Sequence, residues 1–156
     1  MEYRDLMKWK GYISLHELME PEENSLRVLI DRCVVGNESE AIEVGERVMM
    51  GFPIEVDEGL PIIQLDFESY VSYNVINESF TVLDEYEVFE GDVFRIYTKS
   101  RYLDFITLGT IAEDIYADQH FVHYQLVCLN HIIDIISYEE PKITELGRVS
   151  FSIKFE

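Results

Sequence analysis

Lysine and arginine are absent from Val48 to Phe94, a stretch of 47 residues that carries eleven acidic residues. Residues 1–47 hold 11 acidic and 6 basic side chains and residues 95–156 hold 9 and 6, so the three parts carry −5, −11 and −3 of the total charge of −19. A charge of this size repels nucleic acid and anionic membranes and attracts cationic ligands or basic proteins. We therefore expect neither direct nucleic-acid binding nor membrane binding.

Cysteine is also scarce, since Cys33 and Cys128 are the only two. Each lies in an apolar run, where a thiol packs as a small hydrophobic side chain, and their spacing forms neither a disulfide framework nor a CxxC metal motif. We expect both thiols to be reduced. No apolar run approaches the roughly 18 residues of a membrane span, and residues 1–12 contain no continuous apolar stretch. The expected location is the cytoplasm.

Motifs that identify a reaction are missing as well. The chain has no GxxxxGK[ST] phosphate-binding loop and no GxSxG nucleophile motif. Asp134, between Ile133 and Ile135, is the carboxylate in the most apolar part of the sequence, and with His131 it offers a general acid or base. One residue of this kind does not predict an enzyme, so we assign no catalytic residue and no cofactor.

The composition is that of a folded protein. The 156 residues are 47% hydrophobic and 13% aromatic. A chain of this length buries about 70% of the surface that its unfolded form exposes. We expect residues 1–156 to form a single globular domain.

Strands are predicted by the spacing of apolar residues. From Ile62 to Ile76 the apolar residues fall mainly on one parity, which is the period of a strand with one buried face. The length of this run indicates a bend near Ser69 or a crossing between two sheets. The other expected strands are residues 26–35, 121–130, 131–137, 45–50, 93–98 and the C-terminal 149–155.

Helix is expected in few places. Apolar residues at helical spacing, with Gly109 as the stop, predict a helix that begins after Thr98 or Ser100. Thr110 to Glu113 matches a capping box and predicts a second short helix ending near Tyr116, and residues 6–19 suggest a helix turning into a strand. The expected fold is mainly β (α+β at the margin), an antiparallel β-sandwich or partly open barrel with one or two short helices inserted around residues 99–116.

An acidic and aromatic segment, residues 84–92, is the strongest candidate for a binding surface. Aromatic side chains supply rigid contact area, and carboxylates accept charge-assisted hydrogen bonds from lysine or arginine. The polar face of the preceding strand extends this surface. The residues assigned to partner binding are Asp66, Glu68, Tyr70, Asp84, Glu85, Tyr86, Glu87, Phe89 and Glu90. The alternative is an edge strand or turn whose aromatic residues fill the core.

Two smaller clusters contain residue types that bind anions or metal ions. Arg95, Lys99 and Arg101 lie near an expected helix N-terminus and form a candidate anion site; the alternative is that they neutralise the acidic block. His120 and His123 are residue types that bind zinc, iron or manganese, but residues three apart on a strand point to opposite faces. Because HxxH lacks a paired second motif, we assign no metal site.

Three functional hypotheses remain. The first is a small acidic cytoplasmic binding protein that masks a basic protein partner, as an immunity protein or antitoxin-like inhibitor masks a nuclease. The second is a small-molecule-binding or catalytic β-barrel, with His123, His131 or Asp134 as the polar group of an aromatic-lined pocket. The aromatic residues expected in that interior are Phe67, Tyr73, Tyr97 and Tyr124. The third is a structural or assembly subunit.

Overall fold

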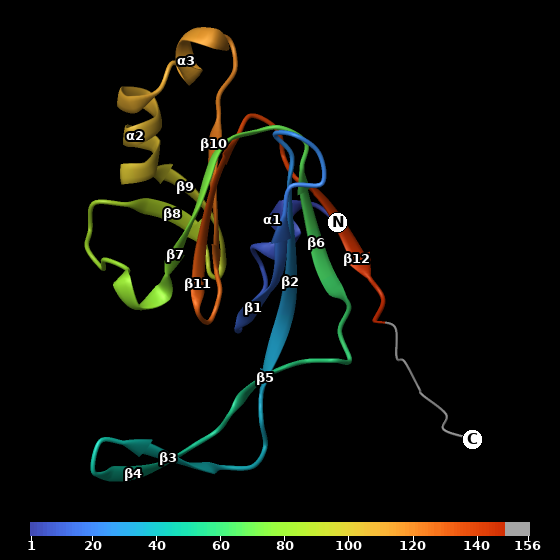
Figure 1. Ribbon diagram of the computed structural model, residues 1–156, viewed down its shortest axis with the longest axis vertical. Helices are drawn as coiled ribbons and strands as arrows, with labels where there is room; N and C mark the ends of the chain where they lie inside the picture. The colour runs from blue at the N-terminus through green and yellow to red at the C-terminus, as the bar shows by residue number, and fades with distance from the viewer. Residues whose placement is uncertain (149–156) are drawn as a thin grey trace.

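The computed structural model describes residues 1–148, which form two antiparallel β-sheets and a separate hairpin (Figure 1). The first sheet has the order β1-β2-β6-β12, and β5 also pairs with β2. The second sheet has the order β7-β11-β10-β9-β8. The strands of the first sheet are β1 (Ile13–Met19), β2 (Leu26–Val35), β5 (Ile54–Val56), β6 (Ile62–Phe67) and β12 (Lys142–Leu146). Those of the second are β7 (Tyr70–Asn77), β8 (Val88–Gly91), β9 (Phe94–Lys99), β10 (Val122–Val127) and β11 (His131–Ser137).

The two sheets pack face to face over a filled core, so the fold is the expected mainly β sandwich rather than a barrel. Ile63 and Leu65 of the first sheet meet Leu126 and Ile133 of the second, and all four are fully buried. Tyr3 of the short helix α1 (Tyr3–Leu6) enters the same core, where its hydroxyl donates to the carbonyl oxygen of Arg95 at 2.9 Å. The space between the sheets is therefore occupied by side chains.

The long alternating run from Ile62 crosses between the sheets, as its length predicts. β6 belongs to the first sheet and β7 to the second, and the chain turns at residues 68–69. The expected helix is α2 (Arg101–Gly109), whose first turn is capped by the Ser100 hydroxyl accepting the Leu103 backbone N–H at 3.0 Å. Both features follow from local sequence, which explains why sequence alone predicts them.

Several local expectations were wrong or incomplete. The short helix α3 (Ala112–Ile115) exists, but Thr110 does not form a capping box with Glu113, because the Glu113 carboxylate accepts the Thr107 hydroxyl instead. The strand expected at 45–50 is one arm of a hairpin, β3 (Glu40–Val44) and β4 (Arg47–Gly51). β12 was not predicted, and the expected strand at 149–155 lies outside the described residues.

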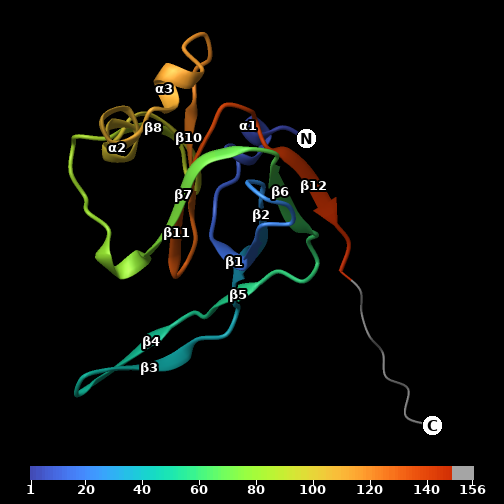
Figure 2. The same ribbon diagram turned by 45° about the horizontal axis from the view of Figure 1, so that its top comes forward.

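Three segments lie beside the second sheet, on the side away from the first (Figures 1 and 2). They are α2, α3 and residues 78–87, which begin with the 3-10 turn η1 (Glu78–Phe80). The β3–β4 hairpin projects away from both sheets in the two views. No helix within residues 1–148 is long and apolar enough to cross a membrane.

Candidate functional site

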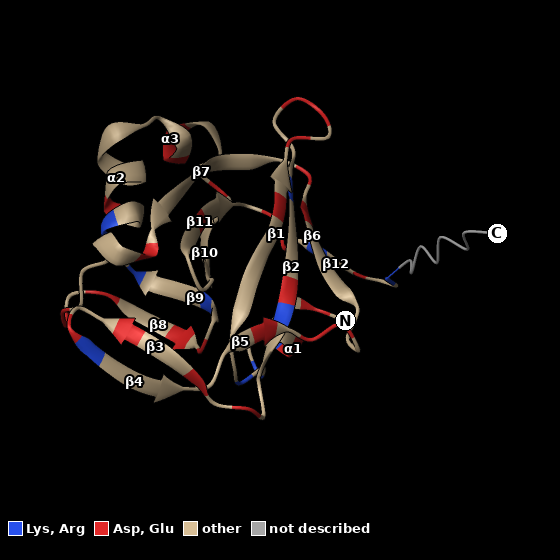
Figure 3. Ribbon diagram, turned by 60° about the horizontal axis from the view of Figure 1, so that its bottom comes forward, with Lys and Arg blue, Asp and Glu red and all other residues tan. Residues whose placement is uncertain are grey.

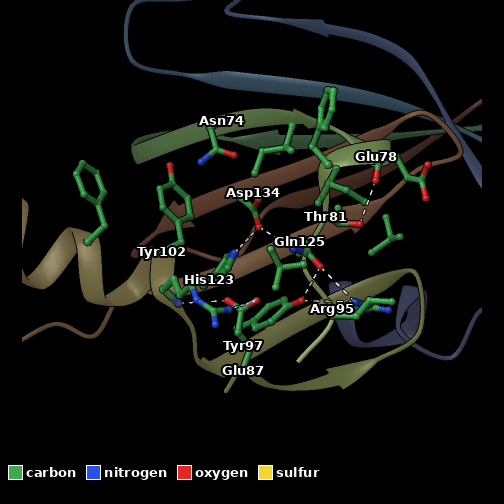
Figure 4. A pocket seen from close by; sticks show the side chains of 18 residues that line it. Asn74, Glu78, Thr81, Glu87, Arg95, Tyr97, Tyr102, His123, Gln125 and Asp134 are labelled. Atoms are coloured by element: carbon green, nitrogen blue, oxygen red, sulfur yellow. Dashed lines mark hydrogen bonds and ion pairs between the residues drawn. The ribbon is translucent and has the colours of Figure 1, made fainter. Parts of the chain in front are cut away.

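The outer face of the second sheet forms the floor of a cavity of about 630 Å³ (Figure 4). Alternate residues of each strand point to opposite faces, so the residues between those that fill the core reach this floor. α2 contributes Tyr102 and Phe105 to the walls, and residues 78–87 contribute Phe80 and Leu83. The cavity is thus built by a rigid sheet on one side and by two connecting segments on the other.

A row of polar side chains crosses four strands of this floor. In the strand register Arg95 of β9 lies opposite Gln125 of β10, Gln125 opposite Asp134 of β11, and Asp134 opposite Asn74 of β7. The Gln125 amide nitrogen donates to Asp134 Oδ1 at 2.9 Å, and its oxygen accepts the Tyr97 hydroxyl at 2.7 Å. These hydrogen bonds fix the geometry of Gln125 and Asp134 across the β10–β11 pair.

His123 connects this row to the helix. Its Nε2 lies 2.7 Å from Asp134 Oδ1, and its Nδ1 lies 2.7 Å from Ser100 Oγ. Ser100 Oγ already accepts the Leu103 N–H, and within residues 1–148 its hydroxyl hydrogen has no other acceptor than His123 Nδ1. These contacts are all satisfied when Nδ1 accepts from Ser100 and Nε2–H donates to Asp134.

The hydrogen-bonded group of Ser100, His123 and Asp134 has the residue types of a catalytic triad, but its geometry differs from that of a working triad. In a hydrolase the serine hydroxyl must be free to attack a substrate, and the carboxylate orients the imidazole by accepting a hydrogen bond from the ring nitrogen that does not face the serine. Here Ser100 is completely buried and caps a helix, and His123 is only 1% exposed with both ring nitrogens occupied. The arrangement instead fixes the position of Asp134.

Asp134 is the polar group that remains incompletely paired. Both of its hydrogen bonds within the described chain go to Oδ1, and His123 is the only basic side chain that contacts it there. The adjacent Asn74 has a buried Oδ1 that finds no hydrogen-bond partner among residues 1–148. A buried acceptor without a donor is costly, so this end of the cavity is short of hydrogen-bond donors.

Aromatic and apolar side chains complete the cavity. The Tyr97 ring stacks on His123 with centroids 4.5 Å apart, and Tyr102 meets the same imidazole edge-on at 5.4 Å. Burial raises the pKa of both tyrosines, so their hydroxyls stay protonated near neutral pH. Beyond the polar row, Val127, Ile132 and Ile76 form an apolar row across three strands.

The residues assigned to partner binding do not form one surface. Asp66 lies in the first sheet, where it accepts the Arg27 Nε–H at 2.7 Å, and Glu68 lies in the turn that follows β6. Tyr70 begins β7 and donates its hydroxyl to Glu20. Because β7 and β8 are opposite edges of the second sheet, three strands separate Tyr70 from Phe89 and Glu90 of β8.

Much of the 84–90 segment is engaged within the chain. Asp84 and Glu87 both pair with Arg101, which lowers the pKa of Asp84. The Tyr86 hydroxyl donates to Asp104, and its ring lies 4.4 Å from Lys99 Nζ. The Phe89 ring lies 4.0 Å from the Arg95 guanidinium, Glu90 lies 3.6 Å from Arg4, and Glu85 is exposed. The aromatic residues are partly exposed and do not fill the core.

The residues of the candidate anion site and the two histidines do not each form one cluster in the structure. Arg95 and Arg101 line the cavity. Arg101 is paired with Asp84 and Glu87, and Lys99 faces the Tyr86 ring. His120 precedes β10 and lines a separate cavity of about 450 Å³, whereas His123 belongs to the larger one. Across residues 1–148 no three His, Cys, Asp or Glu side chains are placed to hold a metal ion.

Sequence reasoning identified Tyr97, His123 and Asp134 as pocket residues but placed them in a barrel interior with Phe67 and Tyr124. Phe67 and Tyr124 instead pack in the core with ring centroids 5.4 Å apart, Tyr73 packs against that core, and His131 does not line the cavity. Gln125, Asn74 and Ser100 were missed. Polar residues inside strongly apolar strands were the available signal for Gln125.

No protein-family model, curated protein or solved structure matches this chain.

Proposed function

We propose that this protein binds a small organic molecule in the cavity on the outer face of the second sheet. The observation that supports this most directly is the combination of a mostly apolar cavity of about 630 Å³ with a preformed polar row that contains Asp134. Ligand sites of small molecules have volumes of about 300–1,000 Å³, mostly apolar walls and a few fixed polar groups. The buried His123 argues for binding rather than for acid–base catalysis.

The proposal is tested by filling the cavity. Ile76 lines the cavity and is 41% exposed, so Ile76→Trp places an indole in it with little effect on the core. Val75 is 44% exposed and does not line the cavity, so Val75→Trp on the same strand is the matched control. We expect the neutral fluorescent probe N-phenyl-1-naphthylamine to bind the wild type and Val75→Trp but not Ile76→Trp. Equal binding to all three proteins would place the probe elsewhere and reject the site.

A second candidate function is favoured by the β3–β4 hairpin. Every residue of its two strands except Gly51 is exposed, including the apolar Ile42, Val44, Val48, Met49 and Met50. Residues 34–58 contain seven acidic side chains and one basic one, and Figure 3 shows acidic residues along β3. We propose that this acidic and apolar arm binds a basic protein, in the manner of an immunity protein or antitoxin-like inhibitor.

This second function is tested by comparing two acidic surfaces in one capture experiment. Replacing Met49 and Met50 by serine removes apolar contact area on the hairpin without changing the charge. Replacing Glu85 and Glu87 by lysine changes the surface next to β8. We expect a basic protein captured by the wild type at low salt to be lost with the hairpin variant. Retention by the hairpin variant and loss by the Glu85 and Glu87 variant would assign the partner to residues 84–90.

A further inference from the structure

We infer that the ligand of the cavity is an organic amine, bound as its ammonium ion to Asp134 with its apolar body against the apolar row. The inference rests on the proposed function and specifies the ligand class of the same site. Three observations carry it: the charge of the polar end, the engagement of the cavity's own cations, and the distribution of apolar walls.

No lysine or arginine pairs with Asp134 within residues 1–148, and the arginine of the polar row, Arg95, lies two strands away on β9. Asp134 is 5% exposed, and the groups hydrogen-bonded to it are the His123 imidazole and the Gln125 amide rather than a lysine or an arginine. A buried carboxylate without a cationic partner is costly, and an ammonium ion held against it forms a short charge-assisted hydrogen bond. Asn74, its cross-strand neighbour, offers a second oxygen that has no donor.

Both arginines that line the cavity are hydrogen-bonded within the described chain, Arg95 only to uncharged oxygens. Arg95 Nε donates to the Asp92 carbonyl at 2.5 Å, and its NH1 lies 3.4 Å from Gln125 Oε1 and 3.5 Å from the Tyr97 hydroxyl. Arg101 pairs with Asp84 and Glu87. Asp134 and Glu78 remain as acids of the wall without an ion pair to lysine or arginine within residues 1–148. An anionic group placed beside Asp134 would therefore meet a carboxylate that no lysine or arginine pairs with in the described residues.

The remaining walls fit an aromatic or aliphatic body. Val127, Ile132 and Ile76 continue the floor from the polar row, and Phe80 and Leu83 face the cavity from residues 78–87. A ligand with an ammonium group at one end and an apolar body at the other satisfies both parts. A metal ion does not fit, because no group of three His, Cys, Asp or Glu side chains in the described residues is placed to hold one.

Three probes with the same naphthalene body test this inference: 1-naphthylmethylamine, 1-naphthalenemethanol and 1-naphthoate. Their affinities are measured by displacement of N-phenyl-1-naphthylamine at pH 7. We expect the amine to bind at least about tenfold more tightly than the alcohol, a difference of about 1.4 kcal/mol, and the carboxylate to bind least. An alcohol or carboxylate equal to the amine would overturn the ligand class while leaving the pocket proposal intact. Absence of binding by all four compounds would overturn both.

Two variants test the role of Asp134 itself. Asp134→Asn keeps an oxygen for His123 and Gln125, and we expect it to abolish the preference for amine over alcohol while alcohol affinity is unchanged. The double variant Asn74→Asp with Asp134→Asn moves the carboxylate to the neighbouring strand and should restore a preference for the amine. An amine preference that persists in folded Asp134→Asn would contradict the assignment. If that variant does not fold, the comparison of the three probes on the wild type still decides the ligand class.

Discussion

The His123 imidazole holds Asp134 across the β10–β11 strand pair, with Nε2 and Oδ1 2.7 Å apart and both side chains buried. On the other side of the ring, Ser100 ties the imidazole to the first turn of α2. One buried hydrogen-bond chain thus joins the helix to the polar floor of the cavity. Such networks are expensive to interrupt, because each removal leaves other buried groups unpaired.

Replacing His123 by alanine should therefore destabilise the protein strongly. The variant deprives Ser100 of an acceptor and Asp134 of a donor, and it also leaves a cavity below Tyr97. We expect the free energy of unfolding, measured by urea denaturation, to fall by about 2–4 kcal/mol. The exposed His120 provides the control, since His120→Ala should change stability by less than about 0.5 kcal/mol. Equal effects of the two variants would contradict the network.

Arg101 should control the segment that covers the cavity. It pairs with Asp84 and Glu87 on residues 78–87. Exposed ion pairs add little to global stability, so Arg101→Met should leave the urea midpoint nearly unchanged. It should nevertheless speed amide exchange of residues 80–87 and weaken probe binding. Arg47→Met, on the hairpin, is the control and should change neither; unchanged exchange in Arg101→Met would show that the pairs do not hold the segment.

Alkaline pH should destabilise the fold through buried thiol and phenol groups. Burial raises the pKa of Cys128 from 9.0 to about 12 and that of Tyr124 from 10.0 to about 12. Since these groups ionise first in the unfolded chain, their contribution is complete below pH 9 and is lost as the pH rises toward 12. Each group should lower the free energy of unfolding by up to about 1.4 kcal/mol per pH unit in that range.

The comparison of cysteine variants checks this pH dependence. Cys128→Ala should reduce the slope of unfolding free energy against pH between pH 9 and 12. Cys33→Ala should reduce it less, because burial raises the pKa of Cys33 by a smaller amount. Unfolding by urea at a series of pH values measures both slopes. A slope unaffected by Cys128→Ala would show that this thiol ionises as readily in the folded protein as in the unfolded one.

The β3–β4 hairpin should be the least protected β-structure of the isolated protein. In the part of the chain that the structure describes, its two strands pair only with each other, and a two-stranded hairpin is marginally stable by itself. We expect amides of residues 40–51 to exchange with solvent orders of magnitude faster than those of β10 and β11. Addition of a protein partner that binds the hairpin should slow their exchange. Strong protection in the isolated chain would indicate that a second copy already covers the arm.

The fold could be predicted where the signal was local. The alternation in β6 and β7, the apolar run of β2 and the Ser100 cap with Gly109 at the helix end each specify their element from neighbouring residues. β12 was missed because Lys142 to Leu146 has a short and weak pattern, and its partners in β6 lie 76 to 84 residues earlier in the chain. Long-range pairing of this kind has no local signature.

The site was predictable only in part for the same reason. Asp134 and His123 could be selected from the sequence as candidate site residues because each is a polar residue among apolar neighbours. Their partnership depends on the β10–β11 register, and the link to Ser100 depends on where α2 begins. The acidic segment 84–90 seemed a free surface because the sequence does not reveal that Arg101 pairs with two of its acids.

The most direct test of the account is an amide ¹H–¹⁵N spectrum of the protein during titration with 1-naphthylmethylamine. Binding in the cavity predicts shifts that saturate at Asn74, Gln125 and Asp134 and at residues 78–87, with Ile76→Trp abolishing them. Shifts confined to the acidic hairpin or spread evenly over the acidic surface would contradict the account, because they would show that the amine binds charge alone and not the cavity.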